Sequence, residues 1–138
     1  MRQCQHIVQI DTDGQGMTEI TAGVARWLAG EKAQTGLLTL FIRHTSASLT
    51  IQENADPTVQ SDLMDALDGL ASRDAPYRHH TEGPDDMPAH IRSMLTGVSL
   101  QVPVGGGRML LGTWQGIYLI EHRDRPHRRE VVLHYAGD

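Results

Sequence analysis

The sequence predicts an α+β fold: a compact single domain over residues 1–138 with about three helices and an antiparallel or mixed, sandwich-like β-sheet. The length of 138 residues suits one domain, and 39% hydrophobic with 21% charged residues is typical of a folded protein. Candidate strands dominate both ends of the chain, and the helices between them lack a regular βαβ rhythm. Cys4 is the one cysteine, so an intrachain disulfide is excluded and the core must form by burial alone.

The first part of the chain predicts a strand, a helix and a buried strand. His6 to Ile10 is the first strand candidate, closed by aspartate and glycine turn residues. A helix follows whose apolar residues recur at helical spacing: Ile20, Val24, Trp27 and Leu28. Thr18 is its candidate N-cap and Gly30 its candidate end. Leu37 to Ile42 is almost wholly apolar, which predicts a buried strand, with Leu49 to Ile51 also extended.

The middle of the chain contains two further helix signals. Asp56 followed by Pro57 predicts a helix start, because the carboxylate can cap free N–H groups and proline at the first helical position loses no hydrogen bond. This second helix runs to about Leu70. Residues 72–86 are rich in proline, glycine, histidine and acid, which predicts a long loop. Pro88 then opens a short third helix.

The last forty residues are predominantly β. Alternating and apolar runs predict four strands: Val98 to Val104, Arg108 to Leu111, Trp114 to Glu121, and Arg129 to Tyr135. Three glycines, residues 105–107, predict a hairpin turn between the first two. A phosphate-binding loop is excluded there, because a strand follows the glycines where a helix would be needed. We expect these strands to form an antiparallel meander.

The charge balance limits the classes of partner. A formal net charge of −5 argues against nonspecific binding to nucleic acid or to anionic membranes. No apolar run approaches a bilayer-spanning length, and the N-terminus has no signal-peptide pattern. With one cysteine, a cytoplasmic location is expected. The residues from His122 to Arg129 nevertheless concentrate four of the twelve basic residues, so anions could bind locally.

Eight histidines are many for this length, and the question is which of them converge. His44 lies where a buried strand ends, and His80 and His90 flank a junction between loop and helix. Imidazoles from separate elements could bind one divalent metal ion and leave a position open for water or substrate. The alternative for these three is an ordinary surface or capping role. That ordinary role is favoured for the remaining histidines: His6, His79, His122, His127 and His134.

Several acids and amides are further candidates. Glu53 and Asn54 precede the second helix, where they could orient a ligand or support a ligating histidine. Asp86 could cap the third helix. Gln115 and Glu121 share one face of a strand by alternation, and Glu121 could serve as a general base or a metal ligand. The alternative for each is an exposed or capping residue.

The basic run contains four arginines: Arg123, Arg125, Arg128 and Arg129. Arginine can clamp a phosphate with two parallel hydrogen bonds, and the same run could be a solvated β-turn. The sequence leaves both interpretations open.

Four motifs together resemble the YjbQ-like family, which is also described as a family of secondary thiamine-phosphate synthases. They are Arg43-His44-Thr45-Ser46-Ala47-Ser48-Leu49, Glu53-Asn54-Ala55-Asp56-Pro57, Asp85-Asp86-Met87-Pro88-Ala89-His90-Ile91 and Leu111-Gly112-Thr113-Trp114-Gln115-Gly116-Ile117. They occur in the expected order over essentially the whole chain, and Glu121 and the arginine-rich turn follow them. Two positions depart from the family pattern: Asp85 replaces the usual asparagine, and residues 124–128 replace a common Asp-Gly-Pro-Arg.

The resemblance implies a homotrimer with a pocket near the subunit boundaries. It implies a divalent metal, with zinc most expected, held by His44, His80 and His90. The implied activity is that of a metal-dependent enzyme on phosphorylated small molecules, joining hydroxymethylpyrimidine diphosphate to thiazole phosphate with loss of pyrophosphate. Glu121 or Glu53 would move protons in this scheme. The residues expected to bind the substrate are Ser46, Asn54, Asp86, Gln115, Arg125 and Arg128. The alternative is a noncatalytic trimeric module that binds a metal or a small ligand.

Overall fold

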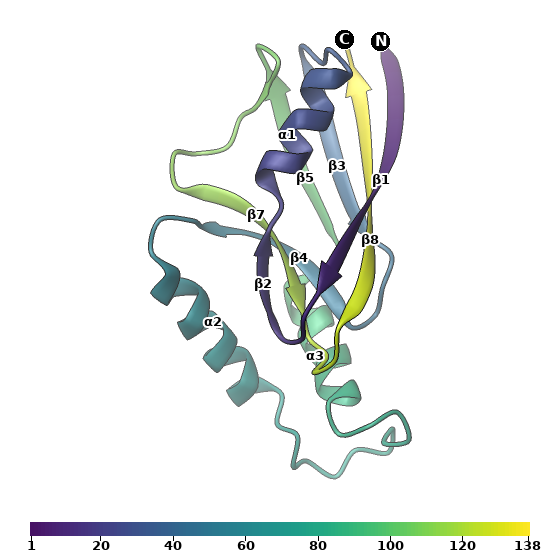
Figure 1. Ribbon diagram of the computed structural model, residues 1–138, viewed down its shortest axis with the longest axis vertical. Helices are drawn as coiled ribbons and strands as arrows, with labels where there is room; N and C mark the ends of the chain where they lie inside the picture. The colour runs from purple at the N-terminus through teal and green to yellow at the C-terminus, as the bar shows by residue number, and fades with distance from the viewer.

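Two antiparallel sheets form the framework of the computed structural model, which describes residues 1–138 (Figure 1). The large sheet has the order β1 (Arg2–Thr12), β8 (His127–Gly137), β3 (Gly36–Ile42), β5 (Ser99–Gly105) and β6 (Arg108–Met109). The small sheet has the order β2 (Gly16–Glu19), β7 (Gln115–Glu121) and β4 (Ala47–Glu53). Three helices accompany them: α1 (Thr21–Gly30), α2 (Pro57–Leu70) and α3 (Asp86–Thr96). The α+β class predicted from the sequence is confirmed, and every strand pair is antiparallel.

The hydrophobic core lies between the two sheets and beneath α1. It contains sixteen buried residues, supplied by the inward faces of the strands, by Val24 and Leu28 of α1, and by Ile20 and Ala33, which lie on either side of that helix. Alternation along β3 turns Leu38, Leu40 and Ile42 inward. Leu40 lies opposite Leu133 of β8 and Leu100 of β5, so the apolar residues of neighbouring strands form continuous rows.

The first and last strands of the chain pair along their whole length. β1 is in register with β8 from Arg2 opposite Gly137 to Thr12 opposite His127. The two termini therefore lie side by side at one end of the molecule (Figure 1). β8 also pairs with β3 on its other side, which makes it an interior strand of the large sheet.

Local sequence signals locate two features correctly. Oδ1 of Asp56 accepts a hydrogen bond of 3.0 Å from the backbone N–H of Thr58, and α2 begins at Pro57. Gly106 and Gly107 connect β5 to β6 with φ angles of 58° and 78°, the left-handed conformation that a tight hairpin turn needs.

Three details of the predicted fold are corrected. The last strands do not form a meander, because β7 joins the small sheet while β5, β6 and β8 belong to the large one. Thr18, predicted as an N-cap, lies in β2, a strand that the sequence analysis missed, and Ile20 occupies the cap position of α1. α3 begins at Asp86, two residues before Pro88.

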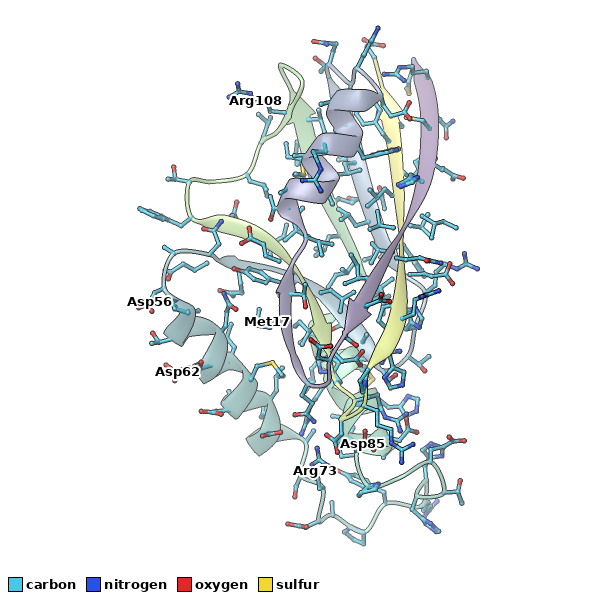
Figure 2. All side chains as sticks on the ribbon, in the orientation of Figure 1. Met17, Asp56, Asp62, Arg73, Asp85 and Arg108 are labelled. Atoms are coloured by element: carbon cyan, nitrogen blue, oxygen red, sulfur yellow. The ribbon has the colours of Figure 1, made fainter.

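The end of the molecule opposite the termini carries a large share of its polar side chains. The long loop between α2 and α3 meets the end of β7 and the start of β8 there (Figure 1). In Figure 2, Arg73 and Asp85 both lie in this region. None of the three helices combines the length and the apolar character that crossing a membrane requires.

Candidate metal site

Arg123, just after β7, fastens the loop that precedes α3. Its Nε donates to Oδ2 of Asp85 at 2.8 Å, its Nη1 to Oδ1 of Asp86 at 2.8 Å, and its Nη2 to the carbonyl of Glu82 at 2.9 Å. The backbone N–H of Asp124 also donates to Oδ2 of Asp85 at 2.9 Å. Burial alone would raise the pKa of Asp85, but the bonds from Arg123 and Asp124 outweigh it and lower the pKa to about 2.

Three side chains converge beside this contact: His79, Asp86 and His90, called the triad below. Asp86 lies in the first turn of α3 and His90 one turn later, so both occupy the same face of the helix. Nε2 of His79 lies 2.7 Å from Oδ2 of Asp86, and Nε2 of His90 lies 3.2 Å from the same oxygen. The donor atoms of the triad all lie within 4.8 Å of one another.

The triad fits a divalent transition metal. It supplies two imidazole nitrogens and one carboxylate oxygen, a ligand set that zinc commonly takes in sites with an open position. Oδ1 of Asp86 is held by Arg123, which leaves Oδ2 as the oxygen that faces the two histidines. The side chain of Asp86 is 8% exposed, whereas those of His79 and His90 are 46% and 34% exposed. An ion there would be accessible from solvent.

The three histidines predicted as metal ligands are separated in the structure. His90 belongs to the triad, but the donor atoms of His44, His80 and His90 do not form a group within 4.8 Å. Nε2 of His44 accepts the backbone N–H of Glu130 at 2.8 Å, and its Nδ1 lies 3.4 Å from Nη1 of Arg129. Burial, and then the charge of Arg129, lower the pKa of His44 below its ordinary value.

His80 and His79 line a hollow of about 360 Å³ together with Arg73, Tyr77 and Met87. An ordinary surface or capping role was predicted for His79, so its place in the triad corrects that prediction. The spacing of four residues between Asp86 and His90 was a signal that could have identified this pair as neighbours on a helix.

Glu121 lies in a buried polar cluster rather than in an open pocket. Its carboxylate accepts hydrogen bonds from Nε of Arg129 at 2.8 Å, from Oγ1 of Thr12 at 2.6 Å and from the backbone N–H of Arg123 at 3.1 Å. Burial would raise the pKa of Glu121, but the hydrogen bonds from Arg129 and Thr12 lower it below its ordinary value. Arg129 also donates to Oγ of Ser46 at 2.9 Å, so Ser46 joins the same cluster.

Other predicted residues lie at the opposite end of β7. Glu53 is in register with Gln115, and the whole length of β7, about 20 Å, separates Gln115 from Glu121. Oε2 of Glu53 accepts the backbone N–H of Asp56 at 3.2 Å, and Nδ2 of Asn54 donates to Glu19 at 3.4 Å. Glu53, Asn54 and Gln115 are thus brought together, but away from Glu121 and the triad.

The two arginines predicted to bind substrate lie in different surroundings. Arg125 lines a polar hollow of about 440 Å³ with Arg123 and Thr81. Arg128 forms an exposed ion pair with Asp11, with Nε and Oδ1 3.3 Å apart. The two arginines with buried or half-buried partners are instead Arg123 and Arg129.

His122 is a second histidine whose place the sequence did not reveal, and it is buried. His122 has no exposed surface, and its Nε2 lies 2.8 Å from Oγ of Ser48, which accepts a bond of 2.5 Å from Oγ1 of Thr96. Nδ1 of His122 has no partner within the chain. Burial, and then the charge of Arg92, lower the pKa of His122 to about 4, so the ring is neutral at pH 7.

Comparison with known proteins places the chain in a family. The family model described as "UPF0047 protein YjbQ-like" matches residues 6–138. The chain belongs to the UPF0047 protein YjbQ-like family. A UPF0047 protein of Synechocystis is 51% identical over 99% of this chain and 94% of its own length. The structure of a conserved hypothetical protein of Thermus thermophilus is 42% identical, with a TM-score of 0.82, over 93% of this chain and 97% of that one.

Membership of the UPF0047 family corrects the expected activity. A structure from Sulfolobus solfataricus shares the fold, with a TM-score of 0.88 at 18% identity over 99% of this chain and 100% of that one, and is described as a YbjQ-like protein of unknown function. The family description and the Synechocystis relative likewise name no reaction. The prediction of a thiamine phosphate synthase-like enzyme acting on phosphorylated small molecules was therefore wrong. The family resemblance itself is confirmed.

Proposed function

We propose that this UPF0047 protein binds a divalent transition metal through Nε2 of His79, Oδ2 of Asp86 and Nε2 of His90. The observation that carries the proposal is the convergence of these three donor atoms within 4.8 Å. Structural ion pairs can also gather histidine and aspartate, but here both imidazoles turn toward one carboxylate oxygen and remain partly open to solvent. That geometry suits a cation shared by the three side chains.

Zinc is the expected ion because two nitrogen ligands favour zinc, nickel and copper over magnesium and calcium. The hydrogen bond from Arg123 engages one oxygen of Asp86, so a bidentate carboxylate of the kind that calcium prefers would have to displace it. The bound ion would supply a Lewis acid with at least one position open to an external ligand. The hollow lined by His79, His80 and Tyr77 is adjacent to the triad and would give that ligand room.

We propose that the protein is a homotrimer, as the family resemblance implies. The outward face of the large sheet supports an assembly, because no helix covers it and it exposes Ile7, Leu37 and Phe41 at 44%, 39% and 41%. Burial of such a face against another subunit would remove its apolar surface from water. Light scattering that gives three times the 15.2 kDa chain mass would support the trimer, and a monomer at micromolar concentration would contradict it.

The metal proposal is tested by titrating the metal-free protein with Zn²⁺ and with Co²⁺. We expect one ion per chain in the wild type and loss of most of the affinity in His79→Ala and in His90→Ala. His134→Ala is the matched control, since its ring contacts Gln5 on β1 and it is not in the triad. Unchanged stoichiometry and affinity in both triad variants would exclude the site.

The His44→Ala variant separates this proposal from the ligand set expected from the sequence. His44 uses Nε2 to accept a backbone N–H, so its removal should leave metal affinity close to that of the wild type. A loss of affinity as large as that of His90→Ala would instead support a site built on His44.

The cytoplasmic location expected from the lone Cys4 also stays a prediction.

A further inference from the structure

A cavity of about 180 Å³ lies between α2 and the outer face of the small sheet. Leu63, Leu67 and Leu70 line its helix side, and Met17 and Ile120 line its sheet side. Figure 2 shows Met17 on the side of β2 that faces α2, and Asp62 on the outer side of the helix. The helix therefore covers this part of the sheet without closing onto it.

Polar contacts near both ends of α2 fix its position relative to the small sheet. Near its start, Nε2 of Gln60 donates to the hydroxyl of Tyr118 at 3.0 Å. Near its end, Nη2 of Arg92 donates to Oδ1 of Asp68 at 2.8 Å and to the carbonyl of Ala71 at 2.9 Å. No residue of this fourteen-residue helix is buried, although its apolar side chains repeat at helical spacing. The gap is thus held open by specific contacts rather than filled by side chains.

The lining of the cavity defines the chemistry of an occupant. None of its nine residues is charged, and six are hydrophobic. A charged ligand would lose its hydration there without gaining a counter-ion, which is unfavourable. The polar residues of the lining are Thr50, Gln52 and Thr96. Oγ1 of Thr96 is already bonded to Ser48, so the Thr50 hydroxyl and the Gln52 amide are the groups left to satisfy one polar group on the ligand. An apolar protein cavity of roughly 150 Å³ accommodates benzene, which sets the size of the ligand.

We propose that this cavity binds a neutral, largely apolar small molecule of about one aromatic ring that carries a single hydroxyl or amide group. The cavity shares no residue with the triad, so this binding does not depend on the metal. The contacts of Gln60 and Asp68 keep α2 in place as the outer wall.

Phenol is the probe for the test, followed by the methyl NMR signals of Leu63, Leu67 and Ile120 in the wild-type protein. We expect saturable shifts of these signals and little change in the methyl groups of Leu40 and Leu133 in the core between the sheets. Ala66→Phe places a ring in the cavity mouth and should weaken phenol binding at least tenfold, a change of about 1.4 kcal/mol. Ser61→Phe is the control, because it adds the same ring on the same helix outside the cavity lining.

Three outcomes would overturn the proposal. The first is the absence of saturable shifts in the wild type. The second is phenol binding that survives in Ala66→Phe and, should that variant not fold, in Ala66→Asp, which places a charge at the same exposed position. The third is broadening of the same methyl signals with rising protein concentration and no phenol, which would assign the cavity to a second copy of the chain.

Discussion

Nη1 of Arg123 lies 2.8 Å from Oδ1 of Asp86, and this single hydrogen bond decides which oxygen of the aspartate faces His79 and His90. The arginine comes from the end of β7 and the aspartate from the first turn of α3, which follows the long loop. The contact therefore ties the rigid sheet to the helix that carries two of the three triad residues. It also gives the candidate metal site a supporting residue that can be tested separately from the ligands.

Replacing Asp86 with asparagine should weaken zinc binding by at least about tenfold, because the neutral amide oxygen is a poorer ligand and loses its charge attraction to the ion. Isothermal titration of the metal-free protein with Zn²⁺ measures this effect. Asp85→Asn serves as the comparison, since Asp85 bonds to Arg123 but is not in the triad. Equal affinities for wild type and Asp86→Asn would remove this carboxylate from the site.

Replacing Arg123 with alanine should lower the free energy of unfolding by about 1–3 kcal/mol, because the change leaves two buried carboxylates, those of Asp85 and Asp86, without their charged donor. The Arg123 side chain is 19% exposed, so solvent compensates little for the lost contacts. Denaturant unfolding gives the stability, and hydrogen exchange in residues 82–86 reports loosening of the loop. Arg125→Ala should change stability by less than about 0.5 kcal/mol, and a comparable loss in both variants would disprove a specific role for Arg123.

Replacing Glu121 with glutamine should destabilise the protein by about 3–5 kcal/mol, because it leaves the Arg129 guanidinium buried without a counter-ion. The two side chains are 1% and 5% exposed, so neither can turn to solvent. The double variant Glu121→Gln with Arg129→Met should recover part of this loss, measured as coupling in a double-mutant cycle. Full stability of the single variant would show that the ion pair is dispensable.

His122 should make the protein less stable as the pH falls from about 6.5 toward 4. Its pKa in the folded state is about 4, below the ordinary value of 6.5, so the unfolded chain binds the proton first. The contribution of the neutral His122 ring to the free energy of unfolding is complete above pH 6.5. It is lost as the pH approaches 4, a difference of about 3 kcal/mol. Unfolding by urea at pH 7, 5.5 and 4.5 should show a steeper decline for wild type than for His122→Gln. His134→Gln is the control and should follow the wild type. Parallel curves of stability against pH for wild type and His122→Gln would contradict this assignment.

Local signals in the sequence were sufficient where the structure is local. The Asp56-Pro57 helix start and the turn at Gly106 and Gly107 follow from the conformational preferences of those residues. The position of β8 between β1 and β3 could not be predicted this way, because strand pairing depends on contacts between distant segments. The predicted meander failed for this reason.

In the candidate site, too, local relationships could be predicted from the sequence and long-range contacts could not. Asp86 and His90 lie four residues apart on one helix, so their proximity was available from the sequence. His79 reaches them from a loop, and Arg123 reaches Asp86 from the segment just after β7, which no spacing rule encodes. A surface or capping role was predicted for His122, and either a solvated turn or a phosphate clamp for the run that contains Arg129. Tertiary contacts with Ser48 and Glu121 bury both residues instead.

The pairing of β1 with β8 has a consequence for biosynthesis. A ribosome synthesises Arg2–Thr12 long before β8, the strand that completes their hydrogen bonds. One side of β3 also lacks its hydrogen-bond partner until β8 has been synthesised. The large sheet therefore cannot close until β8 has been synthesised, and the nascent chain must keep its β1 edge from aggregating until then.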